Sequence, residues 1–90
     1  MEPKPDNKLI ISNIKKLLLD FGFYSSRGYW VHRENHGHRL SINTFGNRIS
    51  FNLSKPSKDL NLEYDYDTVS FNLRRIVLDD VRNLLENYFK

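Results

Sequence analysis

The sequence predicts a two-layer α+β fold, in which an N-terminal helix, an antiparallel β-meander of four to five strands and a C-terminal helix follow one another. Apolar residues recur at three- and four-residue spacing near both ends of the chain, whereas the middle alternates apolar and polar residues. We expect both helices to cover one face of the sheet. Because 90 residues bury one modest core, residues 7–90 are expected to form a single domain after a flexible N-terminus, residues 1–6.

The two helices have recognisable ends. The first is predicted over residues 7–21, where Asp6 or Asn7 can cap its start and Gly22 can end it in the left-handed conformation. Its apolar stripe consists of Ile10, Ile14, Leu17, Leu18 and Phe21. The second helix is predicted from Ile76 onward, with Asp79 and Asp80 near the start, where the helix dipole favours acidic side chains.

A hairpin around Gly46-Asn47 determines the register of the central strands. Both loop residues tolerate positive φ, so a two-residue loop places Phe45 opposite Arg48. The apolar face then contains the pairs Leu40/Leu53, Ile42/Phe51 and Thr44/Ile49, and the polar face contains Arg39/Ser54, Ser41/Asn52 and Asn43/Ser50.

The strand before this hairpin is expected to join it through a four-residue loop, residues 34–37. That loop pairs Val31 with Leu40 and Tyr29 with Ile42 on the apolar face. On the polar face it sets Trp30 beside Ser41 and His32 beside Arg39.

Beyond the hairpin, the alternation changes parity, which predicts a turn at Asp67-Thr68. The resulting strand pairs are Tyr66/Val69, Tyr64/Phe71 and Leu62/Leu73. The predicted core comprises Val31, Leu40, Ile42, Ile49, Phe51, Leu53, Phe71 and Leu73 against Ile14, Leu17, Leu18, Val81 and Leu85.

The exposed sheet face is the candidate binding surface, because it mixes basic, aromatic and amide side chains. The predicted binding residues are Trp30, His32, Arg39, Ser41, Asn43, Phe45, Arg48 and Asn52. Ser50 shares this face, and Glu63 and Asp65 are expected to make its fourth strand acidic. Large side chains that stack and carry charge suit either a protein partner or a nucleic acid.

The function that follows is a small non-enzymatic binding module for a protein or nucleoprotein partner. Opposed basic and acidic patches on a chain of 90 residues are typical of the inhibitors and adaptors that phages and mobile elements encode. The alternative function is binding of single-stranded RNA or DNA through the same face. A third possibility is a small nuclease-like or toxin-like enzyme. It also stays open that the sheet face is only a solvated surface with no binding role.

Catalytic and metal chemistry have weaker support. The sequence has no cysteine, no glycine-rich phosphate loop and no G-x-S-x-G elbow, so we expect neither an enzyme nor a cofactor. His32, Glu34, His36 and His38 alternate around a predicted hairpin and are the one candidate metal cluster. Histidines in exposed hairpin loops are usually unliganded, so no metal is expected.

Charge and the N-terminal segment indicate the compartment. Residues 21–58 carry six basic residues against Glu34 as the single acidic one, within a net charge of +3. No apolar run is long enough to span a membrane, and Met1–Pro5 lacks the apolar core of a signal peptide. With no cysteine to indicate an oxidising compartment, a cytoplasmic protein is expected.

Overall fold

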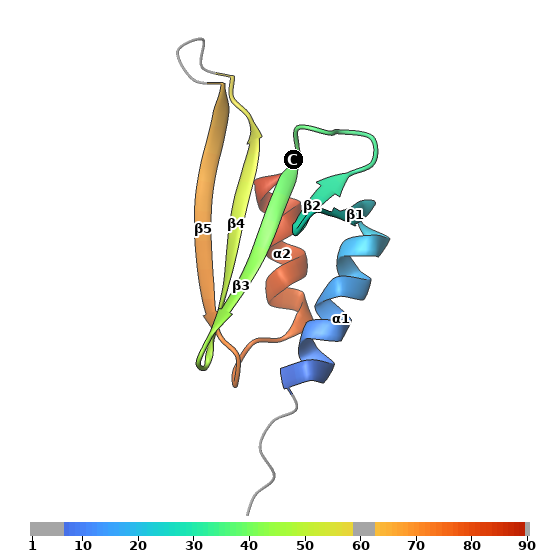
Figure 1. The fold of residues 1–90 in the computed structure, drawn as a ribbon. Helices are drawn as coiled ribbons and strands as arrows, with labels where there is room; N and C mark the ends of the chain where they lie inside the picture. Colours follow the sequence, from blue (N-terminus) through green and yellow to red (C-terminus); the bar gives the residue numbers. More distant parts are fainter. Residues whose placement is uncertain (1–6, 59–62, 90) are drawn as a thin grey trace, which may run out of the picture.

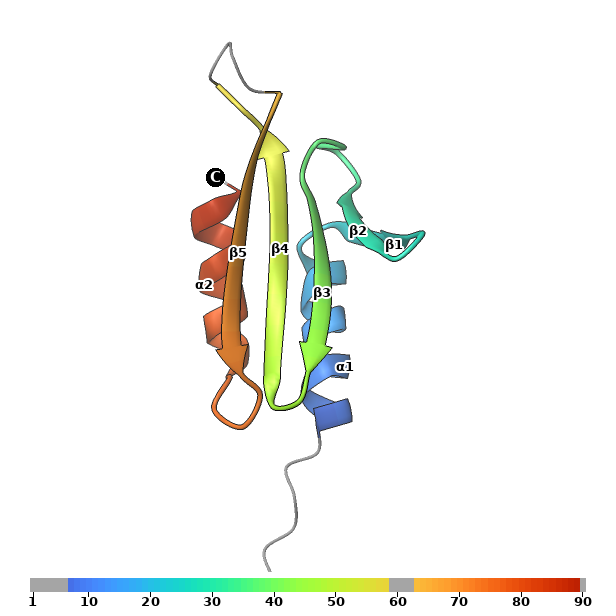
Figure 2. The ribbon, with the colours of Figure 1, turned by 60° about the vertical axis from the view of Figure 1, so that its left-hand side comes forward.

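A computed structural model of the chain describes residues 7–58 and 63–89 and has the predicted α+β architecture (Figure 1). The element order is α1 (Asn7–Asp20), β1 (Phe23–Ser26), β2 (Tyr29–His32), β3 (Arg39–Phe45), β4 (Arg48–Pro56), β5 (Tyr64–Asn72) and α2 (Leu78–Tyr88). The five strands form one antiparallel sheet in sequence order. Both helices lie against the same face of β3, β4 and β5 (Figures 1 and 2).

Helix α1 ends one residue before the predicted boundary, and Gly22 terminates it as expected. The N–H groups of Phe21 and Gly22 donate to the carbonyls of Leu17 and Leu19, each over 3.0 Å. Gly22 has a φ of +94°, which side chains with a Cβ rarely adopt. The ring of His32 also packs against it, because a Cβ at Gly22 would lie 3.0 Å from Nε2.

Helix α2 begins at Leu78, two residues later than predicted, because the preceding residues form its cap. The N–H of Val77 donates to the Asp80 carboxylate over 3.1 Å. This contact satisfies an N–H group that lies outside the helical hydrogen bonds.

The predicted β3–β4 hairpin is confirmed, including every strand pair from Arg39/Ser54 to Phe45/Arg48. Gly46 has a φ of +59° in the two-residue loop, whereas Asn47 keeps a negative φ. Glycine at the first loop position alone is the arrangement of a type II′ turn, whose twist matches that of the flanking strands.

Strand β1 is an element that we did not predict. It pairs with β2 through a two-residue turn in which Arg27 has a φ of +52° and Gly28 a φ of +84°. Two positive φ values in succession characterise a type I′ hairpin turn. The register places Phe23 opposite His32, and the Phe23 side chain is buried.

The predicted β2–β3 register is wrong by one residue. Trp30 lies opposite Leu40 and Val31 opposite Arg39. The connecting loop comprises residues 33–38. The His32 N–H donates to the carbonyl of His38 across it, over 3.0 Å. Since a shift of one residue exchanges the faces of a strand, Trp30 faces the helices and Val31 faces away from them.

The predicted turn at Asp67-Thr68 is also wrong, because β5 runs continuously from Tyr64 to Asn72. Its inward positions pair Phe71 with Ile49 and Val69 with Phe51. The pairs Tyr66/Val69 and Tyr64/Phe71 therefore do not form, and Leu62 lies outside the described residues.

The tyrosines and aspartates of β5 occupy opposite faces. Tyr64 and Tyr66 point away from the helices, whereas Asp65 and Asp67 lie on the helix side, opposite Lys55 and Leu53. Asp67 also accepts the backbone N–H of Thr68 over 2.9 Å.

The core lies between the two helices and the inward face of the sheet. Its buried side chains are Ile14, Leu17, Leu18, Phe23, Leu40, Ile49, Phe51, Leu53, Leu73, Ile76, Val81 and Leu85. Of the predicted core residues, Ile42 and Phe71 are partly buried against this cluster. Val31 is the exception, because the corrected register directs it to the other face.

Within the described part of the chain, neither helix has the length and apolar character required to cross a membrane.

Candidate functional site

The face of the sheet that turns away from the helices is the candidate site, and we call it the outer face. Strand pairing assigns to it Tyr24, Ser26, Tyr29, Val31, Arg39, Ser41, Asn43, Phe45, Arg48, Ser50, Asn52, Ser54, Pro56, Tyr64, Tyr66, Thr68, Ser70 and Asn72. We include Arg27 from the β1–β2 turn and His36 from the β2–β3 loop, because both line a pocket on this face.

The outer face carries positive charge without negative charge. Its charged side chains are Arg27, Arg39 and Arg48, and none of its assigned members is a carboxylate. The expectation that Asp65 would make its fourth strand acidic is wrong, because Asp65 shares the helix side with Lys55. Among the described residues, the single ion pair is the one between Arg82 and Asp79 in α2, at 2.8 Å.

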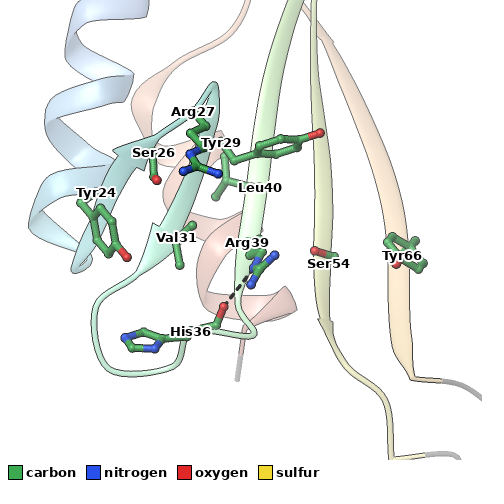
Figure 3. A pocket seen from close by; sticks show the side chains of 10 residues that line it. All are labelled: Tyr24, Ser26, Arg27, Tyr29, Val31, His36, Arg39, Leu40, Ser54 and Tyr66. Carbon is green, nitrogen blue, oxygen red and sulfur yellow. Dashed lines mark hydrogen bonds between the residues drawn. The ribbon is translucent and has the colours of Figure 1, made fainter.

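A pocket of about 600 Å³ opens on this face (Figure 3). Its lining residues are Tyr24, Ser26, Arg27, Tyr29, Val31, His36, Arg39, Leu40, Ser54 and Tyr66. They come from β1, β2, the β2–β3 loop, β3, β4 and β5, so the pocket requires the folded sheet. Aromatic rings and cationic groups therefore converge on one concave surface.

The shape of the pocket follows from the short contact between β2 and β3. The two strands share only the pairs Trp30/Leu40 and Val31/Arg39 in the ladder, whereas β3 and β4 pair along the full length of β3. The β1–β2 hairpin consequently projects away from the plane of β3, β4 and β5 (Figure 2). The concave side of this bend holds Val31 and Leu40 at the pocket wall.

Arg39 has a fixed orientation at the pocket. Its Nε–H donates to the backbone carbonyl of His36 over 3.1 Å, as the dashed line in Figure 3 marks. The guanidinium keeps its other N–H groups for a ligand, since a guanidinium carries five donors.

Neutral polar groups form a network across the middle of the outer face. The hydroxyls of Ser50 and Ser70 lie 2.8 Å apart, and the Thr68 hydroxyl donates to the Asn52 carbonyl oxygen over 2.9 Å. The Asn52 amide nitrogen lies 3.4 Å from the Ser41 hydroxyl. These contacts hold the side chains in place beside the pocket.

The structure brings together six of the eight predicted binding residues on the outer face. They are Arg39, Ser41, Asn43, Phe45, Arg48 and Asn52. Trp30 and His32 are not on it, because the corrected register turns both toward the helices. Trp30 packs partly buried against the core, and the ring of His32 contacts Phe23 with a centroid distance of 5.1 Å.

Four tyrosine or arginine residues of the pocket are absent from the predicted binding residues. They are Tyr24, Arg27, Tyr29 and Tyr66. The sequence signal for the first three is Gly28 alone, which suits the second position of a type I′ turn, whereas an arginine at the first position is unusual. The predicted pair Tyr66/Val69 places Tyr66 on the apolar face, whereas a tyrosine can equally face solvent.

The candidate metal cluster does not assemble. Both ring nitrogens of His32 contact backbone groups, and Nε2 of His36 contacts the carbonyl of Arg33 at 2.9 Å. Across residues 7–58 and 63–89, no three His, Cys, Asp or Glu side chains are placed to hold a metal ion.

The pocket combines groups that bind anions with aromatic rings. Guanidinium, hydroxyl and imidazole groups bind anions and hydrogen-bond acceptors, and exposed rings stack on planar groups. Comparisons of the chain with protein-family models, with curated proteins and with solved structures give no match.

Proposed function

We propose that the chain is a small non-enzymatic binding module that docks on a single-stranded nucleic acid through its outer face. The observation that carries this proposal is the charge of that face, which combines three arginines with no carboxylate among its assigned residues. A nucleic-acid strand carries one negative charge per phosphate, and basic side chains that neutralise it supply much of the affinity.

The aromatic residues of the pocket support a single strand over a duplex. Tyr24, Tyr29 and Tyr66 line the same pocket as two of the three arginines, Arg27 and Arg39. Tyr29 and Tyr66 are 57% and 77% exposed. Proteins that bind single strands combine a basic groove with rings on which unpaired bases stack. In a duplex the bases already stack on one another, so these rings would have no such partner.

A protein partner is the second candidate, and Phe45 is the residue that favours it. This side chain is 89% exposed at the tip of the β3–β4 hairpin, opposite Arg48. Aromatic and arginine side chains are enriched among the residues that dominate protein interfaces. An acidic segment of a protein would fit the positive outer face, with Phe45 as the apolar anchor.

The test is fluorescence anisotropy with labelled homopolymer DNA and RNA oligonucleotides over a series of salt concentrations. Affinity should fall with ionic strength, with a logarithmic slope of roughly −0.7 per phosphate contacted. The double variant Arg27→Ala/Arg39→Ala should bind more weakly and show a shallower slope.

The matched control is Arg74→Ala/Arg75→Ala. It removes the same charge from exposed residues in the loop between β5 and α2 and should change affinity less. If no oligonucleotide binds even at low salt, the nucleic-acid proposal is wrong. Binding of a protein partner that depends on Phe45 would then favour the second candidate.

A further inference from the structure

The ring of His32 makes three hydrogen bonds to the backbone. Nε2 lies 3.0 Å from the carbonyl oxygen of Phe21, and Nδ1 lies 3.1 Å from the amide nitrogens of both Glu34 and Asn35. A carbonyl can only accept and an amide N–H can only donate, so Nε2 must carry the proton and Nδ1 must not. The partners therefore require His32 to be neutral and in the Nε2–H tautomer.

These bonds order the loop that positions Arg39. The carbonyl of Asn35, whose N–H is held by His32, accepts the N–H of His38 over 2.8 Å. The carbonyl of the intervening residue, His36, accepts the Nε–H of Arg39 over 3.1 Å. Hydrogen bonds at Asn35 and His36, together with the backbone that joins these two residues, thus connect an imidazole on the helix side of the sheet to a guanidinium on the outer face.

Protonation of His32 is incompatible with this arrangement. A second ring proton would turn Nδ1 into a donor that faces the two N–H donors of Glu34 and Asn35. Both amides would lose their acceptor, and the start of the loop would lose the contacts that fix its path. The backbone bond from Arg33 N–H to the Gly22 carbonyl, at 2.8 Å, does not depend on the ring.

In the described structure, no acidic side chain forms an ion pair with His32 that would compensate a second proton on the ring. Phe23 of β1 packs against the ring, and the ring of His38 lies 6.2 Å away, centre to centre. His32 lines a second pocket, of about 300 Å³, which Glu86 of α2 also lines. Neither Glu86 nor Glu34 of the loop forms an ion pair with His32 in the described structure. Lys55 of β4 adds a positive charge near His38.

We propose that His32 is a positioning residue for the outer-face site, whose neutral ring orders the 33–38 loop so that Arg39 is held for the ligand. Acidification that protonates His32 releases the loop and weakens binding of a single strand. This regulation rests on the proposed function, because the affected ligand is the one assigned to the outer face.

The pH dependence of oligonucleotide affinity between pH 8 and pH 5, at constant ionic strength, tests the proposal. Electrostatics alone would tighten binding in acid, because protonated histidines add positive charge that attracts phosphate. Ordering of the loop by neutral His32 predicts the opposite trend. Between pH 8 and pH 5 we expect the affinity to fall by on the order of fivefold to tenfold, which corresponds to the loss of one charge-assisted contact.

The decisive variant is His32→Asn. The side-chain oxygen of asparagine accepts N–H groups two residues on, as in an Asx turn, and does not titrate in this range. His32→Asn should therefore bind as wild type does at pH 8 and should not weaken in acid. His38→Phe, which retains an aromatic ring beside Phe89, is the control and should weaken in acid as wild type does. If wild type binds more tightly in acid, or if His38→Phe alone removes the pH dependence, the proposal is wrong.

Nitrogen-15 NMR of the imidazole rings separates this inference from the proposed function. His32 should appear as the Nε2–H tautomer at pH 8, and the amides of Glu34 and Asn35 should lose protection from hydrogen exchange as the ring titrates. If no oligonucleotide binds but this coupled titration is observed, the proposed function fails and the ordering of the loop by His32 stands. Two results would each overturn the inference: an Nδ1–H tautomer of His32 at pH 8, or exchange protection of the Glu34 and Asn35 amides that does not change with pH.

Discussion

The side-chain ammonium of Lys55 lies 2.7 Å from the backbone carbonyl oxygen of Tyr88 and 4.6 Å from the centre of its ring. The Tyr88 hydroxyl in turn donates to the carbonyl of Asp65 over 2.9 Å. Burial, together with the carboxylates of Asp65 and Asp67, raises the pKa of Tyr88. Because Lys55 belongs to β4 and Asp65 to β5, these contacts tie the end of α2 to two strands. Lys55 therefore contributes to stability and is not part of the outer face.

Replacing Lys55 by methionine should lower the free energy of unfolding by about 1–2 kcal/mol, since a charged hydrogen bond and a cation–π contact are lost. Urea denaturation measures this change. Lys58→Met is the control, because Lys58 is exposed and should leave the urea midpoint nearly unchanged. A loss of oligonucleotide affinity in Lys55→Met as large as in Arg39→Ala would contradict the assignment of Lys55 to the helix side.

Phe51→Ala should lower the free energy of unfolding by about 3–5 kcal/mol, because the ring is completely buried and its removal leaves a cavity. Phe45→Ala is a matched control, since it removes the same side chain from a position that is 89% exposed. Chemical denaturation of both variants should show a change of less than about 0.5 kcal/mol for Phe45→Ala. Equal losses in the two variants would mean that the register of the β3–β4 hairpin is wrong.

The neighbouring residues Tyr29 and Trp30 should respond in opposite ways, because successive side chains of a strand point to opposite faces. Trp30→Ala should cost about 2 kcal/mol of stability, since Trp30 is partly buried against the core. Tyr29→Ala should leave stability nearly unchanged. It should weaken oligonucleotide binding by on the order of tenfold, because one base loses the ring on which it stacks. Thermal unfolding and anisotropy on both variants separate the effects, and a reversed outcome would restore the register that places Trp30 outside.

Stability should decrease in mild acid because of His38. Burial, followed by the electrostatic effects of the neighbouring His32 and Lys55, lowers the pKa of His38 below that of a free histidine. The unfolded chain takes up this proton near pH 6.5, whereas the folded chain does so only at lower pH, so folding releases a proton between the two values. The contribution of neutral His38 is complete above about pH 6.5 and is lost as the pH falls through that window.

Urea midpoints measured between pH 8 and pH 5 check this sign. The decrease in acid should be smaller in His38→Phe, which cannot titrate and retains an aromatic ring beside Phe89. A variant with the same pH dependence as wild type would show that His38 is not the group responsible.

The parts of the fold that were predictable are those whose cause is local. Gly46-Asn47 and the alternation on both sides of it are enough to define the β3–β4 register, which is confirmed at every pair. The helix end at Gly22 is likewise a property of one residue, with a φ of +94°. Six of the eight predicted outer-face residues were placed correctly because they belong to that one hairpin.

The errors have causes that lie outside the local pattern. His32 ends β2, and its ring bonds to Phe21, which precedes β1, and to the loop that leads to β3. The alternation of apolar and polar residues in β2 does not predict these contacts. In β5, the predicted turn follows from assigning Tyr64 and Tyr66 to the apolar face, whereas the helix side at that end of the strand holds Asp65 and Asp67.

The sequential strand order has a consequence for folding kinetics. Every ladder of the sheet joins neighbours along the chain, so each strand pair closes only a short loop and loses little chain entropy. Proteins dominated by such local contacts fold faster than sandwiches and barrels of equal stability. Contacts between residues far apart in the sequence are those between α1 and α2 and those of Phe89, at the end of α2, with Phe23 and His38. In stopped-flow refolding, the β-meander should therefore form quickly and the docking of α2 should be the last step. Lys55→Met should accelerate unfolding far more than it slows folding.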